Sequence, residues 1–292
     1  MTIPTISVIC SASRPENWMG LYESIGENDV SIELVFVGPN RPTYDLPDNF
    51  RFIQSNVKPA QCWEIASRSA IGEYIVYVTD DLIYLTDRPM DKLYEIHKTS
   101  RNPNLVVSSM YNFPEGWNRF FSGDMDSPLV ALCWMVPAKL WRDLGGIDRR
   151  FVAVCWDIDM TMRVVASGGE ILTSDVYIDE KIDMPNKPRS RGSTLYSDHL
   201  SSDRALLDSL WSTNGKAHYD RTLPFEPLCD KNLISRSQEP QGRWRYNNRF
   251  YNRIITGRLF YWLKTQRKIN RGRVRRFRIR KIPTYVGRIF SR

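Results

Sequence analysis

Residues 72–81 read GEYIVYVTDD, and this stretch carries the strongest information about the fold. The run EYIVYVT at 73–79 is rich in β-branched and aromatic residues, which is typical of a buried strand. Asp80 and Asp81 follow it directly, and adjacent carboxylates at the end of an apolar strand are costly unless a positive group binds them. The pair predicts a binding site at this strand end, and a solvated turn is the alternative interpretation.

Two similar apolar runs come earlier in the chain, TISVIC at 5–10 and SIELVFV at 31–37. Segments of helical character lie between the runs, at 18–24 and at 60–71. Strands that alternate with helices indicate βαβ units and a largely parallel sheet, so the predicted fold class is α/β.

Polar residues follow each of the three predicted strands. In open parallel sheets, ligands bind beyond the carboxyl ends of the strands, so these residues are expected to gather at one edge. The candidates for binding a ligand there are Ser11, Ser13, Arg14, Asn40, Thr79, Asp80 and Asp81.

The remaining pattern up to about residue 225 continues the alternation of helices and strands. The sequence predicts strands at 104–110, 129–136 and 170–177, and helices at 90–100, 138–144 and 157–166. Gly145 and Gly146 are expected to end the helix at 138–144. A loop is predicted over 183–197, and a final helix is predicted to begin near Ser201 or Ser202.

Cysteine usage and hydropathy indicate the compartment. The 292-residue chain has five cysteines and no C-x-x-C pair, which argues against a disulfide framework or zinc knuckle and favours a reducing environment. The N-terminus lacks the features of a secretory signal, and no apolar run is long enough to span a bilayer. We expect a cytoplasmic protein, with peripheral attachment to a membrane as an open alternative.

The net charge of +8 hides a division between two parts of the chain. Residues 241–292 contain 17 Lys and Arg and no acidic residue, whereas the first 240 residues carry 24 basic and 33 acidic side chains. We therefore expect one domain at 1–225 and a basic, aromatic-rich helical extension at 226–292.

The basic tail at 241–292 has three possible roles. Its aromatic and aliphatic residues recur at helical spacing among arginines, a pattern suited to an anionic membrane surface. Phosphate contacts to nucleic acid and simple packing on the domain are the alternatives. The membrane interpretation is preferred, and nucleic acid is the least favoured.

Three elements of the sequence resemble one known family. GEYIVYVTDD at 72–81 is similar to the strand and D-x-D element of family-2 glycosyltransferases, whose usual form is G-E-Y-I-x-F-L-D-x-D-D. LGGIDRRF at 144–151 and WDIDMTMR at 156–163 resemble that family's G-G-F-D-x-x-F and E-D-x-x-x-x-x-R elements. Their order and spacing agree over roughly residues 5–180. The resemblance implies a GT-A fold, a Rossmann-like sheet that binds a nucleotide-sugar, and transfer of the sugar with inversion.

The resemblance also implies roles for particular acids. Asp81 matches the acid that binds Mn²⁺ or Mg²⁺, Asp80 is the variable middle residue, and Thr79 stands where the first Asp is usual. Asp157 matches the catalytic base, and Trp156 replaces the Glu before it. Because Asp157 begins a predicted helix, an N-cap is its structural alternative.

Other positions depart from the family pattern or extend it. VGPN at 37–40 replaces the usual D-D-G-S, which leaves the nucleotide base open, and Trp63-Glu64 replaces Arg-Asn, which makes Trp63 a candidate nucleotide contact. His199, in a predicted loop, resembles in order the late histidine that binds metal in many GT-A proteins. Asp159 and Arg163 are expected to form an i, i+4 ion pair.

The function predicted from the sequence is metal-dependent glycosyl transfer. The donor is a UDP-, GDP- or dTDP-type nucleotide-sugar, and the acceptor is a glycan or a lipid-linked molecule. The alternatives are a catalytically inactive GT-A-like binding protein and a sugar nucleotidyltransferase. The latter usually has a glycine-rich phosphate loop after its first strand, and SASRPEN at 11–17 contains no glycine.

Overall fold

The computed structural model describes residues 3–113, 116–118, 131–180, 192–213 and 219–221. The basic tail at 241–292, the whole of the expected extension at 226–292 and Cys229 lie outside the described residues. Most of the predicted loop at 183–197 also lies outside them.

Four parallel strands form the first half of the main sheet, in the spatial order β3-β2-β1-β4. They are β1 (Ile6–Ser11), β2 (Ile32–Gly38), β3 (Phe50–Gln54) and β4 (Tyr74–Thr79). The three strands predicted from the apolar runs are confirmed, and β3 was not predicted. Gly38 permits a close approach at the end of β2, because a Cβ there would lie 1.6 Å from the carbonyl oxygen of Ala12.

The second half of the sheet is mixed. β8 lies antiparallel between β4 and β6, β9 is parallel to β6, and β5 pairs antiparallel with β9. These strands are β5 (Leu82–Tyr84), β6 (Leu105–Phe113), β7 (Gly116–Asn118), which pairs with β6, β8 (Met135–Pro137) and β9 (Glu170–Glu180). A separate two-stranded sheet joins β10 (Trp211–Thr213) and β11 (Tyr219–Arg221).

The first three helices each begin with proline. These helices are α1 (Pro15–Ile25), α2 (Pro59–Ser69) and α3 (Pro89–Thr99). Proline has a fixed φ that suits the first turn of a helix, and it lacks the backbone N–H that would have no intrahelical partner there. The predicted segments start one to three residues later because they were placed on the apolar periodicity alone.

The later helices are α4 (Ala138–Asp143), α5 (Trp156–Ala166) and α6 (Gly192–Leu210). α6 begins well before Ser201, so the prediction that the final helix starts near Ser201 is wrong. The predicted strand at 129–136 is also mostly wrong, because Cys133 has φ of 41° and leaves the extended region, so the strand begins only at Met135. Gly145 and Gly146 have φ of 85° and 79° and end α4 as expected.

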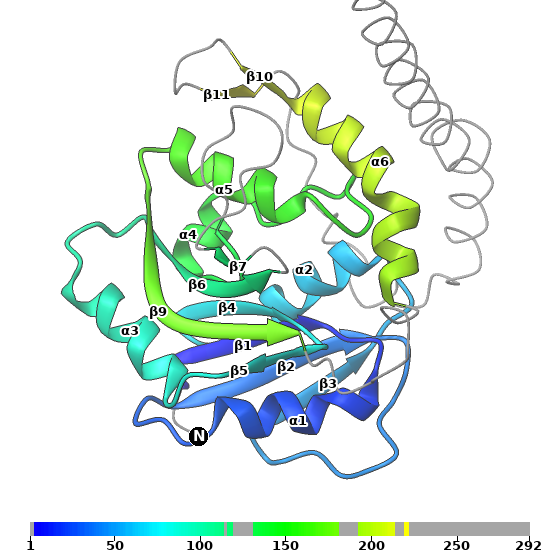
Figure 1. The fold of residues 1–292 in the computed structure, drawn as a ribbon, viewed down its shortest axis with the longest axis vertical. Helices are drawn as coiled ribbons and strands as arrows, with labels where there is room; N and C mark the ends of the chain where they lie inside the picture. The colour runs from blue at the N-terminus through cyan, green and yellow to red at the C-terminus, as the bar shows by residue number, and fades with distance from the viewer. Residues whose placement is uncertain (1–2, 114–115, 119–130, 181–191, 214–218, 222–292) are drawn as a thin grey trace, which may run out of the picture.

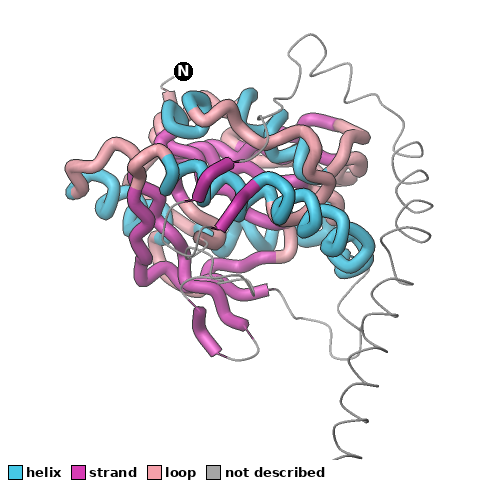
Figure 2. The backbone as a smooth tube through the Cα atoms, turned by 90° about the horizontal axis from the view of Figure 1, so that it is seen from above, coloured by secondary structure: helices cyan, strands magenta, loops and turns pink. Residues whose placement is uncertain are grey.

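Helices cover both faces of the sheet (Figures 1 and 2). On one face Trp18 of α1 packs against Phe36 and Phe52, with ring centroids 5.6 and 5.0 Å apart. On the other face Trp63 of α2 lies beside Tyr77 of β4. The predicted α/β class is confirmed, and the mostly parallel sheet with flanking helices has the GT-A arrangement that the resemblance implies.

Two further expectations concern the described part of the chain. Within it, none of the helices combines the length and the apolar character that crossing a membrane requires. Cys10, Cys62, Cys133 and Cys155 are all buried free thiols, which agrees with the expectation that these residues form no disulfide framework.

Candidate active site

The acid pair after β4 is held by the loop that follows β1. The guanidinium of Arg14 contacts both acids: its Nε lies 2.9 Å from Asp80 Oδ1, its Nη2 also contacts Asp80, and its Nη1 lies 2.9 Å from Asp81 Oδ2. The backbone N–H groups of Ser13 and Arg14 both donate to Asp80 Oδ2, at 2.7 Å. The positive group that the sequence requires for this acid pair is therefore a side chain of the protein itself.

The neighbouring strand ends join the same network. Asn40, after β2, donates from Nδ2 to the carbonyl oxygen of Ser13 at 2.7 Å. Thr79 donates from Oγ1 to Asp81 Oδ1 at 2.7 Å. Ser11, the last residue of β1, lies instead beside the buried thiol of Cys62. The structure thus brings the predicted residues of three strand ends to one edge of the sheet.

The two acids have different surroundings. Asp80 is 2% exposed, and burial raises its pKa above the ordinary value, while Arg14 offsets part of that rise. The carboxylates of Asp80 and Asp81 in turn outweigh the effect of burial on Arg14 and raise the pKa of its guanidinium, so Arg14 stays charged. The side chain of Asp81 is 30% exposed. Asp80 therefore anchors the β1–α1 loop, and Asp81 is the acid available to a ligand.

A divalent cation at this edge of the sheet would need oxygen ligands. Mg²⁺ and Mn²⁺ prefer oxygen ligands, and Mg²⁺ is commonly held by one or two carboxylates together with substrate phosphates and water. No group of three or more His, Cys, Asp or Glu side chains within the described ranges is arranged to hold a metal. The partly exposed carboxylate of Asp81 is the oxygen donor at this edge, and because its two oxygens already contact Arg14 and Thr79, a cation would have to share it with Arg14.

Asp157 lies near the same edge, on α5. Its side chain is partly buried, and Oδ1 accepts the N–H of Ile158 at 3.0 Å. The N-cap position belongs to Cys155, so the structural alternative holds only in part: Asp157 satisfies a first-turn N–H without being the cap residue. The buried thiol of Cys133 lies within electrostatic range of both Asp157 and Asp81, which places the two acids around one residue.

The proton affinity of Asp157 is unusual for an aspartate. Burial raises its pKa to about 6, while the first-turn N–H groups and a hydrogen bond from the Tyr77 hydroxyl act in the opposite direction. A carboxylate with a pKa near 6 is largely ionised at neutral pH and still basic enough to accept a proton. The surroundings of Asp157 therefore suit a general base.

A cluster of aromatic side chains lies next to Asp157. Trp156 packs against Trp63 and Tyr77, with ring centroids 4.9 and 5.0 Å apart, and Tyr77 packs against Trp134 at 5.0 Å. Trp63 is buried, and its indole N–H donates to the carbonyl of Val78 at 3.0 Å. Trp63 thus packs within the aromatic cluster, and its role as a nucleotide contact stays a prediction.

The buried acid Asp203 holds the backbone segment that precedes α5. Asp203 of α6 accepts the backbone N–H groups of Val152, Ala153 and Val154, the last two at 2.8 and 2.9 Å. Burial raises its pKa to about 6 as well. Sequence reasoning missed Asp203 because its partners lie about 50 residues away and are all backbone groups.

Two other predictions concern residues of α5 and α6. His199 is buried at 4% exposure within α6, not in a loop, and its role as a metal ligand stays a prediction. Asp159 and Arg163 form the expected i, i+4 pair at 2.9 Å. The pair is buried, and Arg163 also donates to the carbonyls of Leu144 and Gly146 at 2.6 Å, which ties α5 to the turn after α4.

Comparison with known proteins gives similarity in structure only. No protein-family model and no curated protein sequence matches the chain. Residues 1–349 of S. aureus TarS, solved also with UDP, are similar with 13% identity and a TM-score of 0.46, over 69% of this chain and 72% of that one. The chain covers 46% of the longer TarS structure. The mannosyltransferase PcManGT from Pyrobaculum calidifontis, solved with GDP-Man and Mn²⁺, is similar with 17% identity and a TM-score of 0.48, over 70% of this chain and 65% of that one.

Proposed function

We propose that the chain is a glycosyltransferase that moves a sugar from a nucleotide-sugar to an acceptor hydroxyl with inversion. The observation that carries the proposal is that two acids with different surroundings, Asp81 and Asp157, lie at the same end of the sheet. Asp81 is partly exposed beside a permanent cation, and Asp157 has its pKa raised to about 6 by burial. Asp81 suits a metal ion that would accompany the diphosphate of the donor, and Asp157 suits proton transfer.

Binding of the donor uses the polar edge of the parallel strands. The guanidinium of Arg14, which pairs with Asp80 and Asp81 beyond the end of β1, would supply positive charge beside a bound diphosphate. Asp81 would hold Mn²⁺ or Mg²⁺, which when bound offsets the charge that develops on the leaving nucleoside diphosphate. Ser13, Asn40 and Thr79 fix the shape of this edge through their hydrogen bonds.

Asp157 performs the proton transfer. Its carboxylate accepts the proton of the acceptor hydroxyl while that oxygen attacks the anomeric carbon from the face opposite the leaving group. A single displacement of this kind inverts the anomeric configuration. The hydrogen bond from the Ile158 N–H orients the carboxylate during the step.

The proposal extends to the rest of the chain. Residues 1–225 form the catalytic domain, and the basic residues at 241–292 attach the enzyme to an anionic membrane surface on the cytoplasmic side. The acceptor is a glycan or a lipid-linked molecule, which such a location would supply.

A thermal-shift screen tests the donor site. UDP-, GDP-, dTDP- and CMP-sugars are added with and without Mn²⁺, to the wild type and to Asp81→Ala. We expect one nucleotide class to raise the melting temperature, more so with Mn²⁺, and the metal-dependent part to disappear in Asp81→Ala.

The same screen separates the alternatives. If no nucleotide-sugar shifts the wild type, the transferase proposal fails. If a donor binds but no sugar is transferred or hydrolysed, the chain is a nucleotide-sugar-binding protein without catalysis. Turnover of a sugar phosphate with a nucleoside triphosphate would identify a nucleotidyltransferase.

A further inference from the structure

One guanidinium joins the two acids that follow β4. Arg14 reaches Asp80 through Nε, at 2.9 Å from Oδ1, and also through Nη2. It reaches Asp81 through Nη1, at 2.9 Å from Oδ2. The other oxygen of Asp81, Oδ1, accepts the hydroxyl of Thr79 at 2.7 Å. Both oxygens of the acid that would hold a metal ion are therefore engaged by groups of the protein itself.

The two ion pairs of Arg14 differ in how easily they can be given up. Asp80 is buried and also accepts the backbone N–H groups of Ser13 and Arg14 at 2.7 Å, so loss of the guanidinium would leave a buried charge without its counter-ion. Asp81 is partly exposed, and an ion pair that reaches solvent contributes little because water competes for both partners. The contact between Nη1 and Asp81 is therefore the one that can be exchanged.

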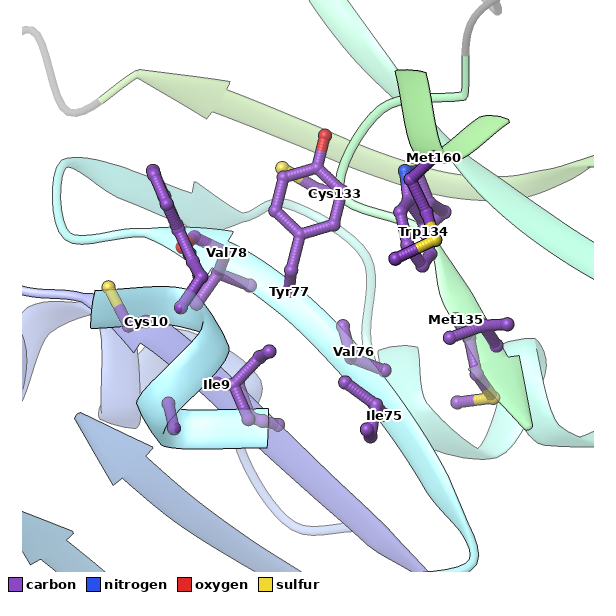
Figure 3. Close-up of a cluster of buried hydrophobic side chains, with 14 of the residues drawn as sticks. Ile9, Cys10, Ile75, Val76, Tyr77, Val78, Cys133, Trp134, Met135 and Met160 are labelled. Carbon is purple, nitrogen blue, oxygen red and sulfur yellow. The ribbon is translucent and has the colours of Figure 1, made fainter. Parts of the chain in front are cut away.

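The backbone around these ion pairs is anchored in the core of the sheet. β1 and β4 are parallel neighbours, with Cys10 opposite Val78 and Ser11 opposite Thr79. Cys10 and Val78 are fully buried, and Figure 3 shows both side chains within the cluster of buried apolar residues. Nη1 can therefore change its partner while the end of β1 and the end of β4 keep their places.

The charges of this edge favour two ligands that bind together. A divalent cation and a guanidinium beside the same carboxylate repel each other, because both are positive. Arg14, Asp80 and Asp81 carry one positive and two negative charges, which is a small surplus with which to hold a cation. Phosphate oxygens are strong acceptors for a guanidinium, so a nucleoside diphosphate offers Nη1 a second partner and adds the negative charge that the cation needs.

We propose that Arg14 is an exchangeable internal cation of the donor site: its Nη1 holds Asp81, and it passes to the diphosphate when nucleotide and metal bind together, while Nε and Nη2 stay on Asp80. The inference rests on the proposed function, because it describes how that donor site is regulated. Arg14 opposes binding of the metal alone and favours binding of the metal with the nucleotide, which makes the two ligands cooperative.

The first measurement is the affinity of the 292-residue chain for Mn²⁺ alone, followed by the EPR signal of the free ion. Arg14→Gln removes the competing charge, so we expect it to bind Mn²⁺ about tenfold more tightly than the wild type. Adding Asp81→Asn to Arg14→Gln should abolish this gain, which would assign it to the Asp81 carboxylate. Arg14→Lys keeps the charge and should bind Mn²⁺ as weakly as the wild type.

Arg68→Gln is the matched control. Arg68 pairs with the buried Glu64 at 2.7 Å, and its exposure is close to that of Arg14. It removes the same charge from the protein as Arg14→Gln, but from another ion pair, so its affinity for Mn²⁺ should equal that of the wild type. Thermal melting would verify that each variant is folded.

The second measurement is the binding of UDP, GDP and dTDP by calorimetry, each with and without Mn²⁺. We expect Mn²⁺ to tighten binding of one of these nucleotides to the wild type, a result that depends on no variant. Arg14→Gln loses the exchange, so the factor gained from Mn²⁺ should be about tenfold larger in the wild type than in Arg14→Gln.

No gain in Mn²⁺ affinity in Arg14→Gln, or an equal gain in Arg68→Gln, would overturn the inference. An effect of Mn²⁺ on nucleotide binding that is the same in the wild type and in Arg14→Gln would also overturn it. The titration with Mn²⁺ alone needs neither nucleotide nor sugar, so it separates this failure from that of the proposed function. If Arg14→Gln gains affinity for Mn²⁺ but the wild type binds none of the nucleotides, the exchange falls together with the proposed function.

Discussion

Asp80 is a buried carboxylate and Asp157 a partly buried one at the same edge of the molecule, and the two are held in different ways. Asp80 accepts two backbone N–H groups and pairs with the guanidinium of Arg14. Asp157 accepts the N–H of Ile158, which is a neutral donor. Burial raises the pKa of each acid, but only Asp80 has a cation that offsets the rise.

This difference explains how one edge can contain an anchor and a base. A buried carboxylate beside a guanidinium takes up a proton less readily than it would without that cation, and Asp80 ties the β1–α1 loop to the end of β4. A carboxylate that is held by neutral donors keeps its orientation and retains a raised affinity for protons. The partner, and not the type of residue or its burial, decides the role.

The largest effect is expected from Asp157→Asn. Asparagine keeps an oxygen for the Ile158 N–H but cannot accept a proton at neutral pH, so transfer should fall by about 10²- to 10⁴-fold. The donor-induced rise in melting temperature should remain, because the diphosphate edge is unchanged. The measurement is initial rate of transfer beside the thermal shift, and a rate within about twofold of the wild type would remove Asp157 from its role.

Arg14→Ala tests the anchor. Removing the cation leaves Asp80 buried and unpaired, which should lower the free energy of unfolding by about 3 kcal/mol at pH 8. The folded-state pKa of Asp80, already raised by burial, then rises further. A raised acid pKa binds more protons in the folded state, so stability falls as pH rises and part of it returns near pH 5.5. Urea unfolding at the two pH values measures both effects.

Arg68→Ala is the matched control for Arg14→Ala. Arg68 pairs with Glu64 at 2.7 Å, and the side-chain exposures of 26% and 2% are close to the 22% and 2% of Arg14 and Asp80. Both variants should lose stability, but only Arg14→Ala should weaken the donor-induced thermal shift. Equal donor binding in the two variants would show that Arg14 is an anchor alone and does not meet the diphosphate.

The sequence predicts the edge of the site well because strand ends are readable in one dimension. Alternating apolar runs and helices place residues after β1, β2 and β4 at one edge, and the structure joins Asn40, Ser13 and Asp80 there. The same pattern does not reveal β3 and β5, which are short, or the end of the 129–136 segment, which depends on the left-handed backbone of Cys133.

The sequence does not distinguish the surroundings of neighbouring acids. Asp80 and Asp81 are adjacent in the sequence, but they differ in burial and in their contacts with Arg14, which lies 66 residues before Asp80. The departures at Trp63 and Trp156 look independent in the sequence, whereas in the structure their rings are in contact at 4.9 Å.

The smallest effect is expected from Asp203→Asn, which sharpens the comparison with a third buried acid. Asp203 shares with Asp157 a pKa of about 6 and neutral backbone donors, but its carboxylate is used up by the N–H groups of Val152, Ala153 and Val154. Asparagine offers a single acceptor oxygen to these groups, so the free energy of unfolding should fall by about 2 kcal/mol. The fall of kcat at acid pH is attributed to protonation of Asp157. Its midpoint should therefore stay near pH 6 in Asp203→Asn. Unfolding in urea and the pH profile of kcat measure the two quantities. A moved midpoint with unchanged stability would instead assign the fall of kcat to Asp203, and a raised pKa would then no longer distinguish the base from the acid that orders the start of α5.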